Sequence, residues 1–161
     1  MSNTNGSTPV TVEGRAIVRA PADRVYELIA NYRTGHPRIV PPKYFQNLLV
    51  ERGGRGAGTV ITYDMKLLGK VRHARARVTE PEPGRVLVET VDTQNFVTTF
   101  RVEPAGDRAS NVTISTVIPP RRGLAGALER VVVRALLAPV YRDELALLDR
   151  VARADLTPAA V

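Results

Sequence analysis

Residues 59–79 read "TVITYDMKLLGKVRHARARVT", and this stretch decides the fold. Apolar or small side chains alternate with polar ones through both halves, which is the period-2 pattern of strands with one buried face. Leu68 and Gly69 stand between the halves, where a tight hairpin turn is expected. The sequence therefore predicts two antiparallel neighbours, with Ile61, Tyr63 and Ala74 on the face turned toward a core.

Similar segments lie on both sides of this hairpin. Glycine- and proline-rich stretches such as "GGRGAG" (53–58) and "PEPG" (81–84) separate them and favour turns. Five further strands are predicted, at residues 10–20, 48–51, 85–91, 96–103 and 111–118. Because consecutive strands joined by short turns pair antiparallel, we expect all seven to form one antiparallel sheet.

Two segments have a helical pattern. In "PADRVYELIAN" (21–31), Val25, Leu28 and Ile29 fall on one stripe. Residues 121–154 are predicted to form one long helix, whose expected inward stripe is Leu124, Leu128, Val131, Ala135, Ala138, Leu145, Leu148 and Ala152.

A single long helix must cover one face of the sheet, and a curved sheet wrapped around it tends to leave a hollow. The predicted class is α+β: a seven-stranded curved antiparallel sheet around a long C-terminal helix, with short helices between strands 1 and 2.

Composition limits the function classes. There is no cysteine, which excludes disulfides, thiol catalysis and cysteine-based zinc sites. The two histidines lie far apart in the sequence, so we expect neither a metal nor another cofactor. No apolar run approaches the ~20 residues that span a bilayer. Residues 1–8 lack the basic and apolar regions of a secretory signal, so the expected location is cytoplasmic.

The net charge of +7 raises the question of a nucleic-acid partner. The basic residues are spread along the chain and interleaved with acidic ones, and only 5% of residues are aromatic. Both features argue against nucleic-acid binding. We expect residues 10–154 to form one domain, with flexible tails at 1–9 and 155–161, and the protein to be a monomer or a homodimer.

The predicted inward residues include two unusual groups. Four are very small, namely Gly14, Ala16, Ala74 and Ala76, and three carry hydroxyls, namely Tyr63, Thr98 and Thr116. Small residues that face a helix either let it approach closely or leave room for a guest molecule. The alternation also places His73, Arg75 and Arg77 on the outer, solvated face.

Residues 32–45, "YRTGHPRIVPPKYF", contain three prolines and one glycine, which prevent a long helix. The segment is nevertheless rich in aromatic and aliphatic side chains, so it could close one mouth of the hollow. His36 lies within it, and two interpretations stay open: a residue that touches a ligand or carries a proton, or an exposed loop histidine. The inward or outward direction of Glu89 is also left open, because residues 85–91 are apolar on both sides.

These patterns give a set of candidate site residues. The hydroxyls suit the orientation of a ligand carbonyl or phenol in an apolar hollow. The expected ligand-binding residues are Tyr32, His36, Tyr44, Phe45, Ile61, Tyr63, Met65, Phe96, Thr98, Phe100, Thr116, Leu128 and Val131. The weak catalytic candidates among them are Tyr63, Tyr44 and His36.

Five segments carry a family resemblance: "APADRVYELIAN" (20–31), "GAGTVITYDM" (56–65), "VTEPEPGRVLVE" (78–89), "TFRVEPAGD" (99–107) and "LLAPVYRDELALLDRVA" (136–152). With them the chain resembles the START/Bet v1-like (SRPBCC) superfamily, and most closely its polyketide cyclase/dehydrase branch. The resemblance implies a helix-grip fold around an internal cavity. Members bind lipids, sterols, polyketides or quinones, and some catalyse aromatisation, cyclisation or dehydration.

The expected function is therefore binding of a small hydrophobic or amphipathic ligand, such as a lipid or polyketide, in an internal cavity. The alternative is a polyketide cyclase, aromatase or dehydratase that uses cavity tyrosines and His36. The sequence leaves open whether the protein is an enzyme, and it does not identify the ligand.

Overall fold

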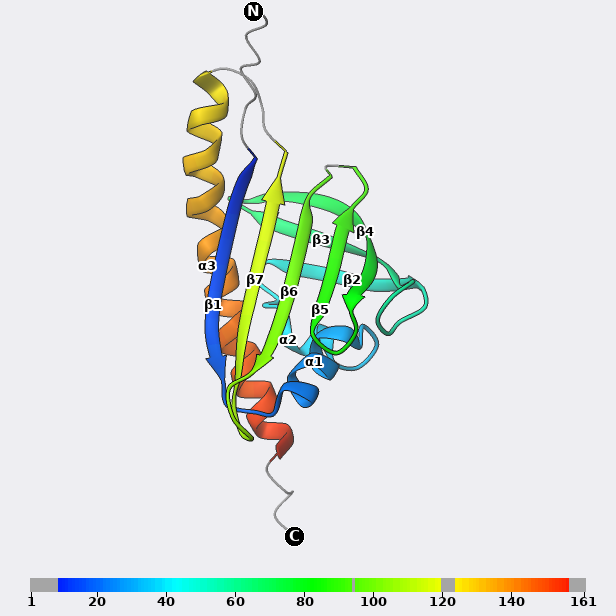
Figure 1. Cartoon of the computed structure of the whole chain (residues 1–161). Coiled ribbons are helices and arrows are strands. Elements are labelled where there is room, and N and C mark those ends of the chain that lie inside the picture. The colour runs from blue at the N-terminus through cyan, green and yellow to red at the C-terminus, as the bar shows by residue number, and fades with distance from the viewer. Residues whose placement is uncertain (1–8, 94, 120–123, 157–161) are drawn as a thin grey trace, which may run out of the picture.

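The computed structural model describes residues 9–93, 95–119 and 124–156, with side chains in the last segment from residue 131 onward. Figure 1 shows a curved sheet with one long helix against it. The strands are β1 (Val10–Val18), β2 (Phe45–Arg52), β3 (Val60–Leu67), β4 (Lys70–Glu82), β5 (Val86–Val91), β6 (Val97–Pro104) and β7 (Ser110–Ile118). The helices are α1 (Ala22–Ala30), α2 (His36–Ile39) and α3 (Leu124–Leu156).

The strands form one seven-stranded sheet in the order β1-β7-β6-β5-β4-β3-β2, and every neighbouring pair is antiparallel. The first strand pairs with the last, with Val10 opposite Ile118. In Figure 1, β2 to β4 turn across the back of the view, and α3 runs lengthwise beside β1. This is the predicted helix-grip architecture, and the short helices α1 and α2 lie between β1 and β2 as expected.

The hairpin between β3 and β4 forms where the sequence predicts it. Leu68 and Gly69 have φ angles of 51° and 73°. Positive φ at both central residues of a two-residue loop matches the twist of the flanking strands. Tyr63 lies opposite Ala74, and Ile61 lies opposite Ala76. Ile61, Ala74 and Ala76 are buried, which confirms the predicted inward face.

The strand register also decides the direction of Glu89. This residue lies opposite Val78 on one side and Thr98 on the other. Val78 lies within the core, and directly opposed residues of an antiparallel pair point to the same face. The Glu89 side chain therefore points inward, and the residue is only 8% exposed.

The predicted inward stripe of α3 is correct near its end and wrong nearer its start. The buried residues are Leu137, Val140, Tyr141, Glu144, Leu145, Leu148 and Ala152. By contrast, Val131 is 66% exposed, and Ala135 and Ala138 are also exposed. A strict seven-residue repeat drifts by about 20° per repeat around a straight helix, so residues 138 and 131 rotate away from the sheet. The side chains of Leu124 and Leu128 lie outside the described residues.

Gly14 lets α3 approach β1 closely. A Cβ atom added at Gly14 would lie 2.7 Å from the Cβ of Tyr141 and 3.4 Å from a methyl group of Leu145. No side chain larger than hydrogen fits there without a shift of the helix. Of the two interpretations of the small inward residues, close helix approach is therefore correct at Gly14.

Helix α3 is also tied to the rest of the domain near its end. The Arg38 guanidinium donates two hydrogen bonds to Asp155, at 2.9 and 2.6 Å. Arg19 makes a similar pair with Asp149, where the closest N–O distance is 2.7 Å. The helix ends at Leu156, two residues beyond the expected boundary at 154. The remainder of the expected tails, at residues 1–8 and 157–161, lies outside the described residues.

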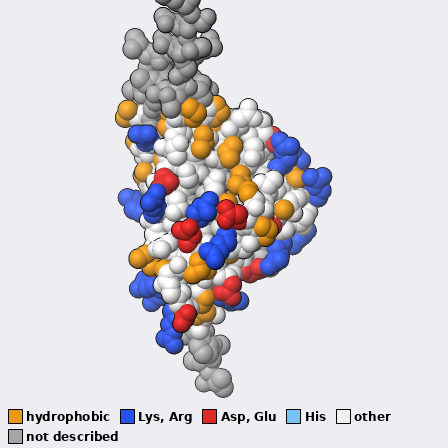
Figure 2. Space-filling view, in the orientation of Figure 1, with side chains coloured by type: hydrophobic (Ala, Val, Ile, Leu, Met, Phe, Trp, Pro, Cys, Tyr) orange, Lys and Arg blue, Asp and Glu red, His pale blue; other side chains and the backbone are white. Residues whose placement is uncertain are grey.

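The outer face of the sheet is polar at His73, Arg75 and Arg77, as predicted, while Ile17 and Val117 are exposed hydrophobic residues elsewhere on it. His73 pairs with Asp64, while Arg75 and Arg77 both donate to Asp92. Figure 2 shows positive and negative side chains interleaved on the face that it presents, which is the usual surface of a solvated sheet. Among the described helices, none combines the length and the apolar character needed to cross a bilayer.

Candidate ligand site

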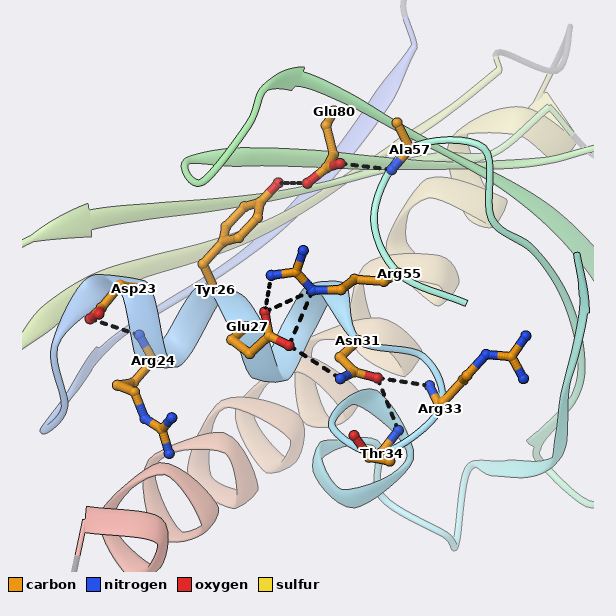
Figure 3. A network of polar contacts seen from close by, with 10 residues as sticks. All are labelled: Asp23, Arg24, Tyr26, Glu27, Asn31, Arg33, Thr34, Arg55, Ala57 and Glu80. Carbon is orange, nitrogen blue, oxygen red and sulfur yellow. Dashed lines mark hydrogen bonds and ion pairs between the residues drawn. The ribbon is translucent and has the colours of Figure 1, made fainter. Parts of the chain in front are cut away.

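A network of polar contacts fixes the end of α1 against the glycine-rich loop at residues 53–58 (Figure 3). Glu27 pairs with Arg55, with the closest N–O distance at 2.5 Å. The Tyr26 hydroxyl donates to Glu80 at 2.7 Å, and Glu80 also accepts from the backbone N–H of Ala57. The loop is thus a structural connector, and it positions the chain that follows α1.

That chain turns sharply at Asn31. Its side-chain oxygen accepts hydrogen bonds from the backbone N–H groups of Arg33 and Thr34, at 3.2 and 3.1 Å. The next residue, Tyr32, donates its backbone N–H to the carbonyl of Gly54 at 2.9 Å. These bonds direct the Tyr32 side chain, which is 1% exposed, into the core.

His36 is buried, with 3% exposure, so the interpretation as an exposed loop histidine is wrong. It begins α2, and its ring stacks on Tyr32 with the centroids 4.4 Å apart. Nδ1 lies 2.7 Å from the carbonyl oxygen of Ile29. Because a carbonyl only accepts, Nδ1 carries a proton. The other ring nitrogen, Nε2, faces Glu89 Oε1 at 3.7 Å.

Glu89 joins Tyr32 and His36 to the sheet. The Tyr32 hydroxyl donates to Glu89 Oε1 at 2.5 Å, within the buried interior. Burial, followed by the nearby Glu89 charge, raises the pKa of Tyr32 well above its usual value. The phenol therefore stays neutral and acts as a donor to the carboxylate.

A second carboxyl approaches from α3. Glu144 is 4% exposed. Burial, and then the charge of Glu89, raise its pKa to about 8. No hydrogen bond joins its carboxyl to any other described residue. The sequence analysis missed Glu144, although an available signal was its place three residues after Tyr141 and four before Leu148, on an otherwise apolar stripe.

We call Tyr32, His36, Glu89 and Glu144 the buried acidic cluster. Burial, and then the charges of Glu89 and Glu144, raise the pKa of Tyr63. Burial also raises the pKa of Tyr141, and the same two carboxyls contribute to the increase. The described residues include no group of three or more histidine, cysteine or carboxylate side chains suited to hold a metal ion. The cluster can accept hydrogen bonds and exchange protons.

A chain of hydroxyls lies beside this cluster. The Thr98 and Thr116 hydroxyls are 2.7 Å apart, and the Tyr141 hydroxyl donates to that of Thr116. The structure thus brings together two predicted hydroxyls from neighbouring strands and adds a third from α3, which the sequence analysis did not anticipate.

The other expected residues divide by exposure. Ile61 and Phe100 are buried, at 1% and 4%. Half-buried residues packed against the core are Tyr44, Phe45, Tyr63, Met65 and Phe96. The rings of Phe45 and Tyr63 meet edge to face at 5.8 Å. Along β3, the inner face therefore changes from closed at Ile61 to partly accessible at Tyr63 and Met65.

Three expected residues are not brought to the cluster. The Tyr44 hydroxyl donates to Asp143 at 3.1 Å, and Asp143 also pairs with Lys43 at the surface. Val131 is exposed, so its expected contact with a ligand inside the sheet is wrong. The side chain of Leu128 lies outside the described residues.

Comparison with known proteins places the chain in a family. The model of the family described as "Polyketide cyclase / dehydrase and lipid transport" matches residues 9–153. The chain belongs to this family. No curated protein gives a significant match.

Family members are hydrophobic-ligand-binding or polyketide cyclase-like proteins, and solved structures share the fold. The Zhui aromatase/cyclase from Streptomyces sp. R1128 aligns at a TM-score of 0.78 and 17% identity, over 95% of this chain and 99% of that one. A START superfamily protein from Mycobacterium smegmatis aligns at a TM-score of 0.73 and 14% identity, over 92% of this chain and 99% of that one. Norcoclaurine synthase from Thalictrum flavum, in complex with dopamine and hydroxybenzaldehyde, aligns at a TM-score of 0.70 and 13% identity, over 98% of this chain and 95% of that one. At these identities the likeness establishes the helix-grip fold.

Proposed function

We propose that the protein binds a small hydrophobic or amphipathic molecule, such as a lipid or polyketide, between the inner face of the sheet and α3. One observation carries the proposal: the inner face of β3 opens from buried Ile61 to half-buried Tyr63 and Met65, beside the buried acidic cluster. Apolar walls with a few convergent polar groups are the usual composition of small-molecule sites. The family assignment supports the same class of ligand.

Burial of the apolar part of the ligand supplies the affinity, at about 25 cal/mol per Å² before the costs of ordering are subtracted. The Thr98–Thr116 hydroxyl pair and the buried acidic cluster set the orientation of the polar end of the ligand. We include in the proposal a cytoplasmic location and a monomeric or homodimeric state.

Tryptophan fluorescence offers a direct test, because the chain contains no tryptophan. Met65→Trp places a single reporter on the half-buried inner face of β3, and Lys66→Trp places one on the exposed outer face of the same strand. Titration with Nile red, a neutral apolar dye, should quench the emission of the Met65→Trp protein with saturation and leave that of the Lys66→Trp protein nearly unchanged. Equal quenching of both reporters, or none of either, would overturn the proposal.

Mass spectrometry of an organic-solvent extract of the purified protein should also reveal a co-purifying apolar compound. A Tyr63→Phe variant should retain it, because the ring that lines the site is unchanged.

A second candidate function is a polyketide cyclase, aromatase or dehydratase. The observation that favours it is the gathering of proton-exchanging groups: His36 lies 3.7 Å from Glu89, and the pKa of Tyr63 responds to both Glu89 and Glu144. Tyr44 has no part in this version, because its hydroxyl is bonded to Asp143. Tyr63→Phe should abolish turnover and change ligand affinity by no more than a few-fold. Full activity of that variant would exclude the tyrosine mechanism.

A further inference from the structure

The buried acidic cluster contains two carboxyls and, beside His36, no basic side chain. Glu89 comes from β5 and Glu144 from α3, and both are less than 9% exposed. Glu89, Thr98 and Thr116 lie opposite one another across β5, β6 and β7. Tyr141, three residues before Glu144 on α3, donates to Thr116, so the two carboxyls face the same part of the interior. Among the described residues, no lysine or arginine is buried. Buried carboxyls are normally paired, so this pair calls for a partner.

The two carboxyls differ in what they already contact. Glu89 accepts from Tyr32 and faces His36 Nε2. Glu144 has no hydrogen bond to another described residue, although the Tyr32, Tyr63 and Tyr141 hydroxyl groups are close enough for their pKa values to respond to it. Among the described residues, no fully buried side-chain oxygen or nitrogen lacks a hydrogen-bond partner, so the Glu144 carboxyl, which has none, keeps some access to solvent. This carboxyl is therefore the part of the interior best placed to bind a ligand group.

We infer that the ligand is an apolar amine, which binds as an ammonium ion with its N–H groups directed to Glu144 and Glu89. An ammonium group offers three donors and a positive charge, so it can donate to both carboxyls and favours the ionised form of Glu144. A carboxylate ligand would place a further negative charge beside these two carboxyls. An alcohol would offer one donor and no charge. This inference rests on the proposed function and specifies its ligand class.

Three ligands with the same apolar chain separate these possibilities: octylamine, 1-octanol and octanoate. Each is titrated at pH 7 into the Met65→Trp protein, with tryptophan emission as the readout. Octylamine should bind at least tenfold more tightly than 1-octanol, and octanoate should bind most weakly. Equal affinity for amine and alcohol, or preference for octanoate, would overturn the inference but leave the proposed function standing. If none of the three binds and Nile red also fails, the proposed function itself is wrong.

Charge-removing variants locate the preference. Glu144→Gln and Glu89→Gln, each made in the Met65→Trp background, should reduce the ratio of amine to alcohol affinity at least fivefold. Glu144→Asp keeps the carboxyl and should retain most of the preference for the amine over the alcohol. The matched control is Asp143→Asn, which removes an adjacent carboxylate on α3 that pairs with Lys43 at the surface. If Asp143→Asn lowers the ratio as much as Glu144→Gln, the amine is bound at the surface and the inference is wrong.

Calorimetry in buffers of different ionisation enthalpy provides an independent readout. At pH 7 a carboxyl with a pKa of about 8 is mostly protonated. An ammonium ion beside it favours the charged form, so binding of octylamine should release up to about one proton to the buffer. Binding of 1-octanol should release none. Absence of proton release with octylamine would contradict contact with Glu144.

Discussion

At the scale of single residues, hydrogen bonds fix the orientations of Tyr32 and His36 beside Glu89. Nδ1 of His36 donates to the carbonyl of Ile29, which leaves Nε2 facing a carboxyl oxygen at 3.7 Å. At 3.7 Å this contact is too long for a hydrogen bond. The same carboxyl oxygen accepts from Tyr32. The orientations of Tyr32 and His36 therefore depend on one hydrogen bond each, to Glu89 and to the Ile29 carbonyl.

Replacement of Tyr32 tests this arrangement. Tyr32→Phe removes the donor to a buried carboxylate and should lower the free energy of unfolding by about 1–3 kcal/mol, as measured by urea denaturation. Tyr26→Phe is the matched control, because its hydroxyl also donates to a glutamate, Glu80, but in a part-buried setting. Its cost should be smaller. A larger loss in Tyr26→Phe would contradict the assigned role of the Tyr32–Glu89 bond.

The site could be predicted from sequence only in part, for reasons visible in particular residues. Tyr63, Thr98 and Thr116 followed from strand alternation, because each lies in a strand with a clear polar face. Glu89 lies in β5, where both faces are apolar, so its direction needed the register against Val78 and Thr98. Glu144 was missed because a charged residue on a helix is ordinarily placed toward solvent.

At the scale of elements, the packing of α3 against β1 depends on Gly14. Gly14→Ala would place a methyl group 2.7 Å from the Tyr141 Cβ. Overpacking of this kind costs about 1–3 kcal/mol, which chemical denaturation should detect as a lower midpoint. Glu13→Ala, on the outer face one residue earlier, should change stability by no more than about 0.5 kcal/mol. Equal effects of the two variants would show that α3 moves freely away from β1.

The elements were predictable where local chemistry fixes them. The β3–β4 hairpin followed from Gly69, which readily adopts positive φ, between two segments of alternating pattern. The positive φ of Leu68 is uncommon for leucine and was not predictable. The inward face of α3 was less predictable, because apolar residues lie on several sides of its first half. Only contact with the sheet distinguishes buried Leu137 from exposed Ala138.

At the scale of the whole molecule, Glu144 should make stability depend on pH. Its pKa is raised to about 8 in the folded protein, so between about pH 4.5 and 8 the folded state binds more protons than the unfolded state. The free energy of unfolding should therefore fall as pH rises through this window. Relative to Glu144→Gln, the wild type should lose at least about 1.4 kcal/mol between pH 5 and 8, the equivalent of one pKa unit.

Urea denaturation of both proteins at several pH values measures this difference. Asp143→Asn is the control, because Lys43 and neighbouring donors hold the pKa of Asp143 below its usual value. Asp143 stays ionised throughout that window, so its variant should differ from the wild type by a constant amount. A constant difference for Glu144→Gln as well would show that Glu144 titrates normally.

The pairing of β1 with β7 has a consequence for how the chain reaches this form. Val10 must find Ile118, and Val18 must find Ser110, so roughly a hundred residues leave the ribosome between the two partners. Until then the earliest strand has no neighbour on which to align, while the β3–β4 hairpin can form from adjacent residues. Such distant pairing slows folding. The nascent chain should thus complete its middle first and join its two ends last.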